Sequence, residues 1–248
     1  MKSTFAERWT PLIATAVLSV ASIVAVSVRL LCLGGGRQFC AEFIGKRTAQ
    51  LLMRIAGLEM RVHDRDKYAL PSDRSVVYIS NHSSTLDIFI LMALGLPRAR
   101  FFMKRRYALI PPIGLLGWAV GTFWTVPQDQ PERRTKIFQR AERVLRRTGD
   151  SVFLSPEGTR VTDGSIGPFN KGAFHLAMSL GAQILPIFIR IPPDVDPGKG
   201  LRTGAGSVDI WFGAPIETTD WQLDQLVQHK DEVREMYVKW SERLGENG

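Results

Sequence analysis

His82 and Asp87 are the first candidates for chemistry, because they lie close together in one short turn of the chain. The apolar run 75–80 before them is typical of a buried strand, and the apolar run from Thr85 onward predicts a buried helix. Turns from strand to helix commonly carry the functional groups of α/β folds. An aspartate on the first helical turn can hold one imidazole nitrogen, which leaves the other free to accept a proton from a hydroxyl.

The same pair also allows a purely structural interpretation. Asp87 can stabilise the positive end of the helix dipole, and His82 can be an ordinary loop histidine. A lone histidine–aspartate spacing is a weak motif, so these two residues alone do not separate the two interpretations.

A second polar turn favours the catalytic interpretation. It follows another apolar run, Ser151–Leu154, and contains Glu157, Gly158, Thr159 and Arg160. An arginine fork matches a phosphate bidentately, and a glycine lets the backbone approach closely. The glutamate can orient a substrate hydroxyl or a neighbouring loop. Without further information, a structural ion pair between Glu157 and Arg160 is the alternative.

With the two motifs in this order, the sequence resembles the glycerolipid acyltransferase family, typified by the 1-acylglycerol-3-phosphate acyltransferases. The resemblance runs from about Val76 to about Ile189 and includes a later apolar-Pro-apolar motif at 185–187. It implies that His82 and Asp87 are the catalytic pair. The expected substrate-binding residues are Glu157, Gly158, Thr159, Arg160, Lys104 and Lys171.

The chain departs from the family between its two motifs. The family has a basic residue near the start of this region, matched by Lys104, and often an arginine after a Gly-x-Ile-Phe-like run. After Trp124 this chain continues with Thr125, Val126 and Pro127, so that arginine is absent. The acceptor headgroup therefore does not follow from this motif.

The implied reaction is transfer of an acyl group from a thioester to the free hydroxyl of a lysophospholipid. The resemblance favours conversion of 1-acylglycerol-3-phosphate to phosphatidic acid in phospholipid biosynthesis. His82 acts as the general base, and Asp87 steadies the imidazolium that forms. Acyl-CoA or acyl-carrier protein is the co-substrate, and no metal and no bound cofactor is expected.

Three alternatives stay open. Another lysolipid or lipid can be the acceptor. A Ser-His-Asp hydrolase would use Ser83 or Ser84, although both adjoin the histidine and no Gly-x-Ser-x-Gly elbow occurs. A non-catalytic lipid-binding scaffold would keep a basic membrane face without needing His82.

The N-terminal region is predicted to be a membrane anchor. Residues 11–28 carry no charge, and Leu30–Leu33 extend the apolar stretch past Arg29. About 18 to 22 such residues suffice to cross a bilayer as a helix. A cleaved signal peptide and a helix lying in the interface are the alternatives. Three glycines at 34–36 mark the end of this part, which predicts an anchor at 1–36 and an acyltransferase domain at 37–248.

The charge of the chain restricts its partners. A net charge of +8 indicates an acidic partner, and no nucleic-acid motif is recognisable. Membrane phospholipids, a lysophospholipid acceptor and an acyl donor are therefore the expected partners, without nucleic acid. More basic residues follow the apolar stretch than precede it, which favours an inner or plasma membrane location with the catalytic domain on the cytoplasmic side.

The remaining pattern predicts the fold class. Strand-like and helix-like segments alternate without internal repeats, which indicates an α/β domain with a mostly parallel sheet flanked by helices. The uncharged stretch 107–126 contains two adjacent prolines and several glycines. This composition argues against a second spanning helix and, after the basic residues at 104–106, is suited to a surface that dips into anionic lipid.

Overall fold

The computed structural model describes residues 5–68, 74–196 and 204–245 of the chain. The remaining residues of the predicted anchor and domain, at 1–4, 69–73, 197–203 and 246–248, lie outside the described part. The longer helices are α1 (Phe5–Leu31), α3 (Lys46–Ile55), α4 (Asp87–Leu94), α5 (Pro111–Val120), α6 (Pro131–Thr148), α7 (Gly172–Leu180) and α8 (Leu226–Gly245). The strands are β1 (Leu58–His63), β2 (Val76–Ser80), β3 (Ala99–Lys104), β4 (Phe123–Thr125), β5 (Ser151–Leu154), β6 (Gln183–Arg190) and β7 (Gly206–Phe212). Short helical pieces are α2 (Arg37–Phe39), η1 (Cys40–Gly45), η2 (Arg105–Leu109) and η3 (Leu223–Gln225).

The strands form one seven-stranded sheet in the order β1-β7-β6-β2-β5-β3-β4. All neighbours pair in parallel except β6 and β7, so β1 and β7 run opposite to the other strands. The prediction of a mostly parallel α/β sheet is confirmed. The reversal has a local cause. In the described residues no helix lies between β6 and β7, and a parallel return would need a long crossover.

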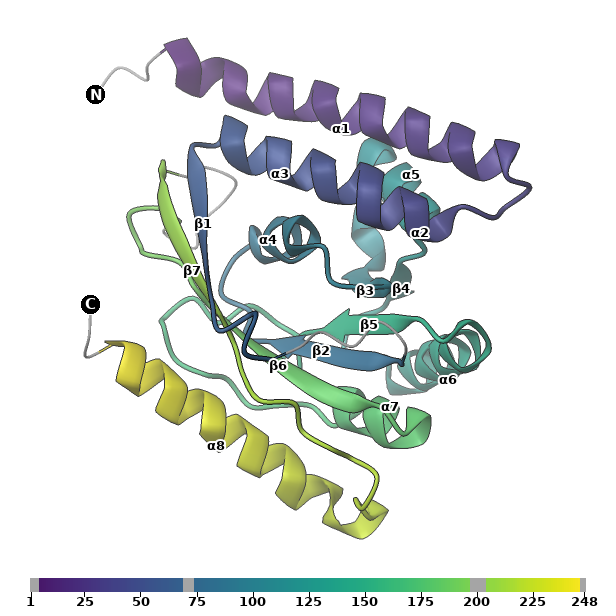
Figure 1. Cartoon of the computed structure of the whole chain (residues 1–248), viewed down its shortest axis with the longest axis vertical. Helices are drawn as coiled ribbons and strands as arrows, with labels where there is room; N and C mark the ends of the chain where they lie inside the picture. The colour runs from purple at the N-terminus through teal and green to yellow at the C-terminus, as the bar shows by residue number, and fades with distance from the viewer. Residues whose placement is uncertain (1–4, 69–73, 197–203, 246–248) are drawn as a thin grey trace.

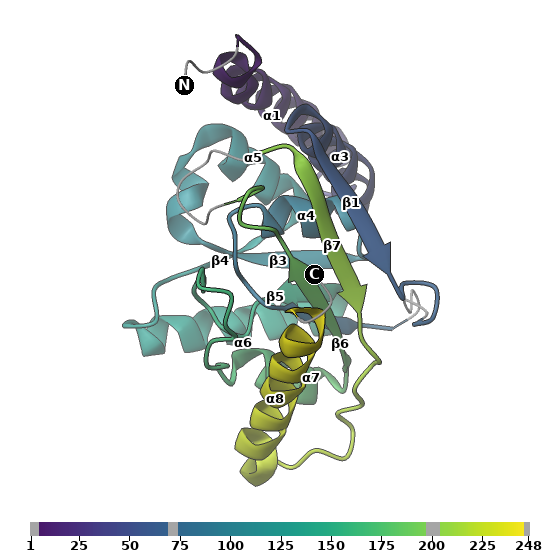
Figure 2. The same cartoon turned by 90° about the vertical axis from the view of Figure 1, so that its left-hand side faces the viewer.

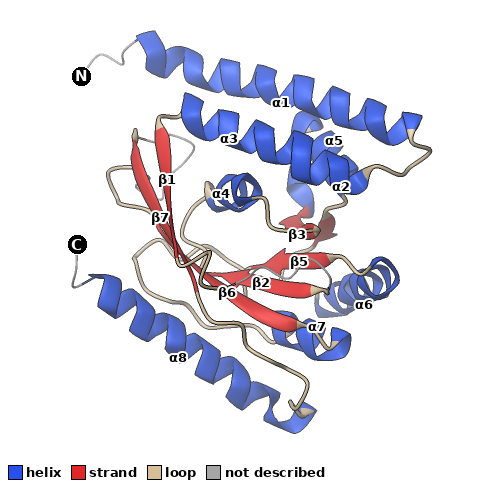
Figure 3. Ribbon diagram, viewed as in Figure 1, coloured by secondary structure: helices blue, strands red, loops and turns tan. Residues whose placement is uncertain are grey.

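Helices cover both faces of the sheet (Figure 3), which explains why most residues of its central strands are apolar. Every residue of β2 and β5 is buried. On one face, α4 lies against the sheet with α3 behind it, and on the other face α6, α7 and α8 pack (Figure 1). Each face has its own buried apolar cluster, one with Leu91 and Leu94 of α4, the other with Leu145 of α6 and Phe174 of α7.

The N-terminal helix α1 packs alongside the domain rather than projecting from it (Figures 1 and 2). Ala21 and Ala25 of α1 share a buried cluster with Ile44 of η1 and with Leu116 and Val120 of α5. Its stretch Pro11–Leu31 is long and apolar enough to cross a membrane. Residues 107–126 form η2, the ten-residue helix α5 and β4, so this stretch holds no second helix of spanning length.

One predicted helix boundary differs from the structure. The helix after His82 begins at Asp87 instead of Thr85, because Ser84 Oγ accepts the Leu86 N–H and forms a separate turn first. At the other end of the chain, α8 begins at Leu226, directly after the short helix η3.

Candidate active site

The turn that carries His82 lies at the carboxyl end of β2, in the middle of the sheet. Residues 81–86 connect β2 to α4. The Asn81 side chain fixes the turn to the neighbouring strand, because its amide donates to the Ile189 carbonyl and its oxygen accepts the Ile189 N–H. With these two contacts, the Asn81 side chain continues the ladder of hydrogen bonds between β2 and β6 beyond the end of β2. His82 therefore follows a residue that is firmly held at the carboxyl end of β2.

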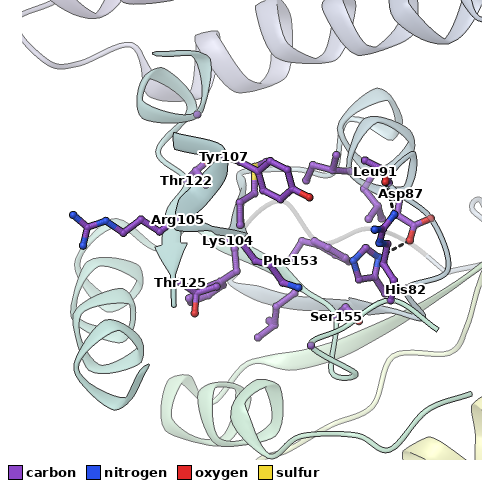
Figure 4. Close-up of a pocket in the computed structure, with 18 of the residues that line it drawn as sticks. His82, Asp87, Leu91, Lys104, Arg105, Tyr107, Thr122, Thr125, Phe153 and Ser155 are labelled. Atoms are coloured by element: carbon purple, nitrogen blue, oxygen red, sulfur yellow. Dashed lines mark hydrogen bonds and ion pairs between the residues drawn. The ribbon is translucent and has the colours of Figure 1, made fainter. Parts of the chain in front are cut away.

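His82 and Asp87 meet as the sequence predicts. His82 Nδ1 lies 2.7 Å from Asp87 Oδ2, and the Asp87 side chain is only 4% exposed (Figure 4). The same oxygen accepts the backbone N–H groups of Ser83 and Ser84, each at 3.0 Å. These three donors fix the carboxylate and place the ring proton on Nδ1. In the described residues no group bonds Nε2, so that nitrogen is available to a substrate.

Neither serine beside His82 is placed as a nucleophile. The Ser84 hydroxyl bonds the Leu86 N–H and Asp196, and the Ser83 hydroxyl is buried and has no partner among the described residues. A serine hydrolase requires a hydroxyl hydrogen-bonded to the catalytic imidazole. The geometry of this turn therefore does not support the hydrolase alternative.

Glu157 fixes the His82 turn through a hydrogen bond to its backbone. Its Oε2 accepts the His82 N–H at 2.6 Å, and its Oε1 accepts the Gly167 N–H at 2.8 Å. The residue is 4% exposed, and burial raises the pKa of its carboxyl although both N–H groups oppose this effect. The sequence allowed Glu157 to orient either a substrate hydroxyl or a neighbouring loop. These contacts show that it orients neighbouring loops.

We expect Glu157→Gln to impair both stability and activity. The amide presents an N–H₂ to one of two backbone donors, so one of these hydrogen bonds is lost at a cost of about 1–3 kcal/mol. The melting temperature should fall by several degrees, and kcat should fall because one side chain no longer holds both the His82 and the Gly167 backbone. Glu142→Gln on α6, at a half-exposed side chain, is the control. Unchanged kcat and melting temperature in Glu157→Gln would contradict this role.

A cavity of ≈ 530 Å³ opens in front of His82, between the sheet and the helices α1, α3, α4, α5 and α6. Its apolar part includes Leu18, Leu52, Leu91, Met92, Ile113 and Leu116. Its basic lining residues are Lys104, Arg105, Arg106, Arg134 and Arg160, whereas Asp87 is the one carboxylate among the lining residues that the structure describes. The cavity therefore combines an apolar wall with a positive field that attracts an anionic headgroup.

The second motif lies on the wall beside His82. Arg160 is exposed, and its Nη1 donates to Thr85 Oγ1 at 2.6 Å. No ion pair joins it to Glu157 among the described residues, so the alternative of a structural pair is wrong. Gly158 has φ +70°, and a Cβ there would lie 2.6 Å from Gln128 Nε2. The turn thus favours glycine for its backbone conformation, whereas the flexible Gln128 side chain could move away from a Cβ. Thr159 also lines the cavity.

The structure separates the two lysines that the sequence proposed for phosphate binding. Lys104 ends β3 and lines the cavity, where Figure 4 shows it between Thr125 and His82. Lys171 precedes α7, its side chain is exposed, and it is not among the lining residues although Asn170 and Gly172 are. Neighbours in sequence therefore face different directions at the start of this helix.

Arg134 and Gln128 line the cavity and were not predicted. Arg134 belongs to a helix with so many basic residues that the sequence indicates only a solvated face. Its position in the first turn of α6, next to the apolar stripe of that helix, was the one available signal.

The comparisons with known proteins agree with this geometry. The Acyltransferase family profile matches residues 60–190, more than half of the chain and both motifs. A chloroplastic 1-acyl-sn-glycerol-3-phosphate acyltransferase of Brassica napus is 37% identical over 58% of this chain and 42% of its own length. The 1-acyl-sn-glycerol-3-phosphate acyltransferase of Saccharomyces cerevisiae is 26% identical over 89% of this chain and 72% of its own length.

A solved structure shares the fold over nearly the whole chain. The 1-acyl-sn-glycerophosphate acyltransferase of Thermotoga maritima superposes with a TM-score of 0.66 at 20% identity, over 92% of this chain and 95% of that one. The Brassica relative and its counterpart in Arabidopsis thaliana are considerably longer, and the matches span only about two fifths of their length. The family match, with its paired histidine and aspartate in front of a basic and apolar cavity, shows that this chain belongs to the Acyltransferase family.

Proposed function

We propose that this protein is a membrane-bound O-acyltransferase that converts 1-acylglycerol-3-phosphate to phosphatidic acid with an acyl thioester as donor. The observation that carries the proposal is the 2.7 Å contact between His82 Nδ1 and Asp87, which leaves Nε2 free at a cavity with apolar and basic walls. The names of the relatives from Brassica and yeast support the choice of acceptor.

The reaction proceeds by direct transfer. The acceptor hydroxyl oxygen attacks the thioester carbonyl carbon while His82 Nε2 takes the hydroxyl proton. The negative charge of Asp87 stabilises the imidazolium that results. When the C–S bond breaks, the leaving thiolate takes this proton, which restores the neutral imidazole. No enzyme nucleophile is needed because the substrate supplies the oxygen.

The walls of the cavity fit the two ends of such substrates. Leu91 and Met92 of α4 and Leu116 of α5 offer apolar contact for acyl chains. Lys104 and Arg160 lie on the wall with His82 and are proposed to hold the acceptor phosphate. The arginine fork gives direction to this contact, whereas the lysine contributes a point charge.

The experiment that tests the function is a mass-spectrometric assay of the purified protein with a panel of lysolipids and both acyl-CoA and acyl-carrier protein. We expect phosphatidic acid from 1-acylglycerol-3-phosphate as the main product. If another lysolipid is acylated faster, that lysolipid is the acceptor instead. If no product forms with either donor, the proposed function is rejected.

We further propose that α1 anchors the protein to the membrane, with the catalytic domain on the cytoplasmic side. Val20, Ile23 and Val24 of α1 are 46–62% exposed, whereas Ala21 and Ala25 pack on the domain. Exposed η2 and α5 residues continue this apolar surface: Leu109, Ile110, Leu115 and Trp118. Arg105 and Arg106 adjoin it and match an anionic lipid surface.

The full-length protein is therefore expected to stay with membranes in high salt and to be released by detergent. Salt screens charges but does not weaken the burial of apolar side chains. Substituting Val20, Ile23 and Val24 by glutamine should release the protein while the packed side of α1 stays unchanged. Leu223→Gln with Val227→Gln is the matched control, because these exposed residues lie in η3 and in the first turn of the far helix α8. Release of the unsubstituted protein by salt alone would show that α1 is not an anchor.

A further inference from the structure

Arg134 is a partly buried arginine that points into the cavity from α6. Its Nη1 donates to the Val126 carbonyl at 3.1 Å, and its guanidinium lies 5.8 Å from the centre of the Phe138 ring. A guanidinium carries five N–H donors, and this carbonyl uses one of them. The other donors have no hydrogen-bond acceptor among the residues that the structure describes.

Two other arginines of this protein have a carboxylate partner. Arg37 and Arg100 both bond Asp150, at 2.7 and 2.8 Å. Arg134 has no such partner in the described part of the chain, and burial lowers the pKa of its guanidinium without an opposing charge. Its place in the first turn of α6 adds to this cost, because a cation there opposes the helix dipole. An anion in the cavity would relieve both effects.

Arg134 also lies close to the stretch where the family motif arginine is absent from this sequence. The arginine expected after Trp124 is absent, and Thr125 and Val126 stand there instead. The guanidinium of Arg134 bonds the backbone of Val126, so a residue from the next helix brings a guanidinium beside the stretch that lacks the motif arginine. Figure 4 shows Thr125 across the cavity from His82, with Lys104 between them.

We propose that Arg134 binds a phosphate ester of a substrate in this cavity, in place of the absent motif arginine. The proposal rests on the proposed function, in which both the acceptor and a coenzyme A donor carry phosphate esters. The planar fork of an arginine suits two oxygens of one phosphate, and Lys104 lies on the same wall to share the charge.

The test measures binding, so it does not depend on turnover. Isothermal titration of the full-length protein in detergent uses two soluble probes, sn-glycerol 3-phosphate for the acceptor and coenzyme A for the donor. Arg134→Gln should weaken binding of a probe by roughly 10- to 100-fold, the contribution of a charge-assisted hydrogen bond. Arg134→Lys should lose less, because it keeps the charge and loses the fork. The matched control is Arg133→Gln, at an exposed neighbour on the same helical turn that bonds Gln130.

Each outcome decides the proposal. A loss confined to glycerol 3-phosphate assigns Arg134 to the acceptor, and a loss confined to coenzyme A assigns it to the donor. In the assay the corresponding KM should rise while kcat changes little. Unchanged binding in both Arg134 variants, an equal loss in Arg133→Gln, or no binding of either probe by the unsubstituted protein would overturn the proposal. Retained activity in His82→Ala would reject the proposed reaction but leave a phosphate site at Arg134 standing.

Discussion

His82→Ala is expected to lower the rate of acyl transfer by roughly 100- to 10,000-fold, the usual contribution of a general base. The imidazole is the one group in the turn whose free nitrogen can take the acceptor proton. Its removal should leave the turn folded, because Asp87 still accepts the N–H groups of Ser83 and Ser84. The measurement is the initial rate with 1-acylglycerol-3-phosphate, together with a thermal melt that shows an intact fold.

A second histidine supplies the matched control. His63 Nε2 lies 2.8 Å from Asp209 Oδ1, and the His63 ring stacks on Trp211. His63 and Asp209 therefore form a similar pair away from the cavity. Its side chain is 41% exposed. His63→Ala should keep full activity. If His82→Ala retains half of the original rate or more, His82 is not the general base and the scaffold alternative gains support.

Asp87→Asn should lower kcat by about 10- to 100-fold, the value of a charge-assisted hydrogen bond. Asp87 Oδ1 is buried and has no partner among the described residues, whereas Oδ2 accepts all three donors of the turn. An asparagine can therefore place its oxygen at the Oδ2 position and keep the Nδ1 proton in place. The variant loses only the negative charge that stabilises the imidazolium.

The acceptor KM should change little in Asp87→Asn, because the carboxylate holds the histidine and not the substrate. A thermal melt should show a modest loss of stability, since the new amide N–H₂ is buried without an acceptor. Asp209→Asn tests the same change in the exposed pair and should leave kcat unaltered. A rise in KM with unchanged kcat would mean that Asp87 acts in binding rather than in the chemical step.

Local chemistry explains why much of the site could be predicted from the sequence. The histidine and aspartate lie within one turn, so their meeting depends only on a strand ending before His82 and a helix starting near Asp87. The strands around them were predictable because burial on both faces makes most residues of β2, β5 and β6 apolar. The same holds for α1, whose uncharged length follows from composition. These properties depend on short stretches of chain, and each short stretch is determined by its own residues.

Contacts between distant segments were decided only by the tertiary structure. Glu157 and His82 are far apart in sequence, and only the pairing of β5 beside β2 brings the carboxylate to the histidine backbone. The direction of β1 and β7 depends on the connection after β6, which hydrophobic periodicity does not encode. Arg134 could not be told from the other arginines of α6, because the face of a helix that meets the cavity is fixed by how Phe138 and Leu145 pack. The sequence alone identified His82 and Asp87 as the candidate reacting groups. The packing of helices on the sheet decided which charges face them. The physical reason is that the surroundings of a side chain arise from contacts between segments far apart in the chain.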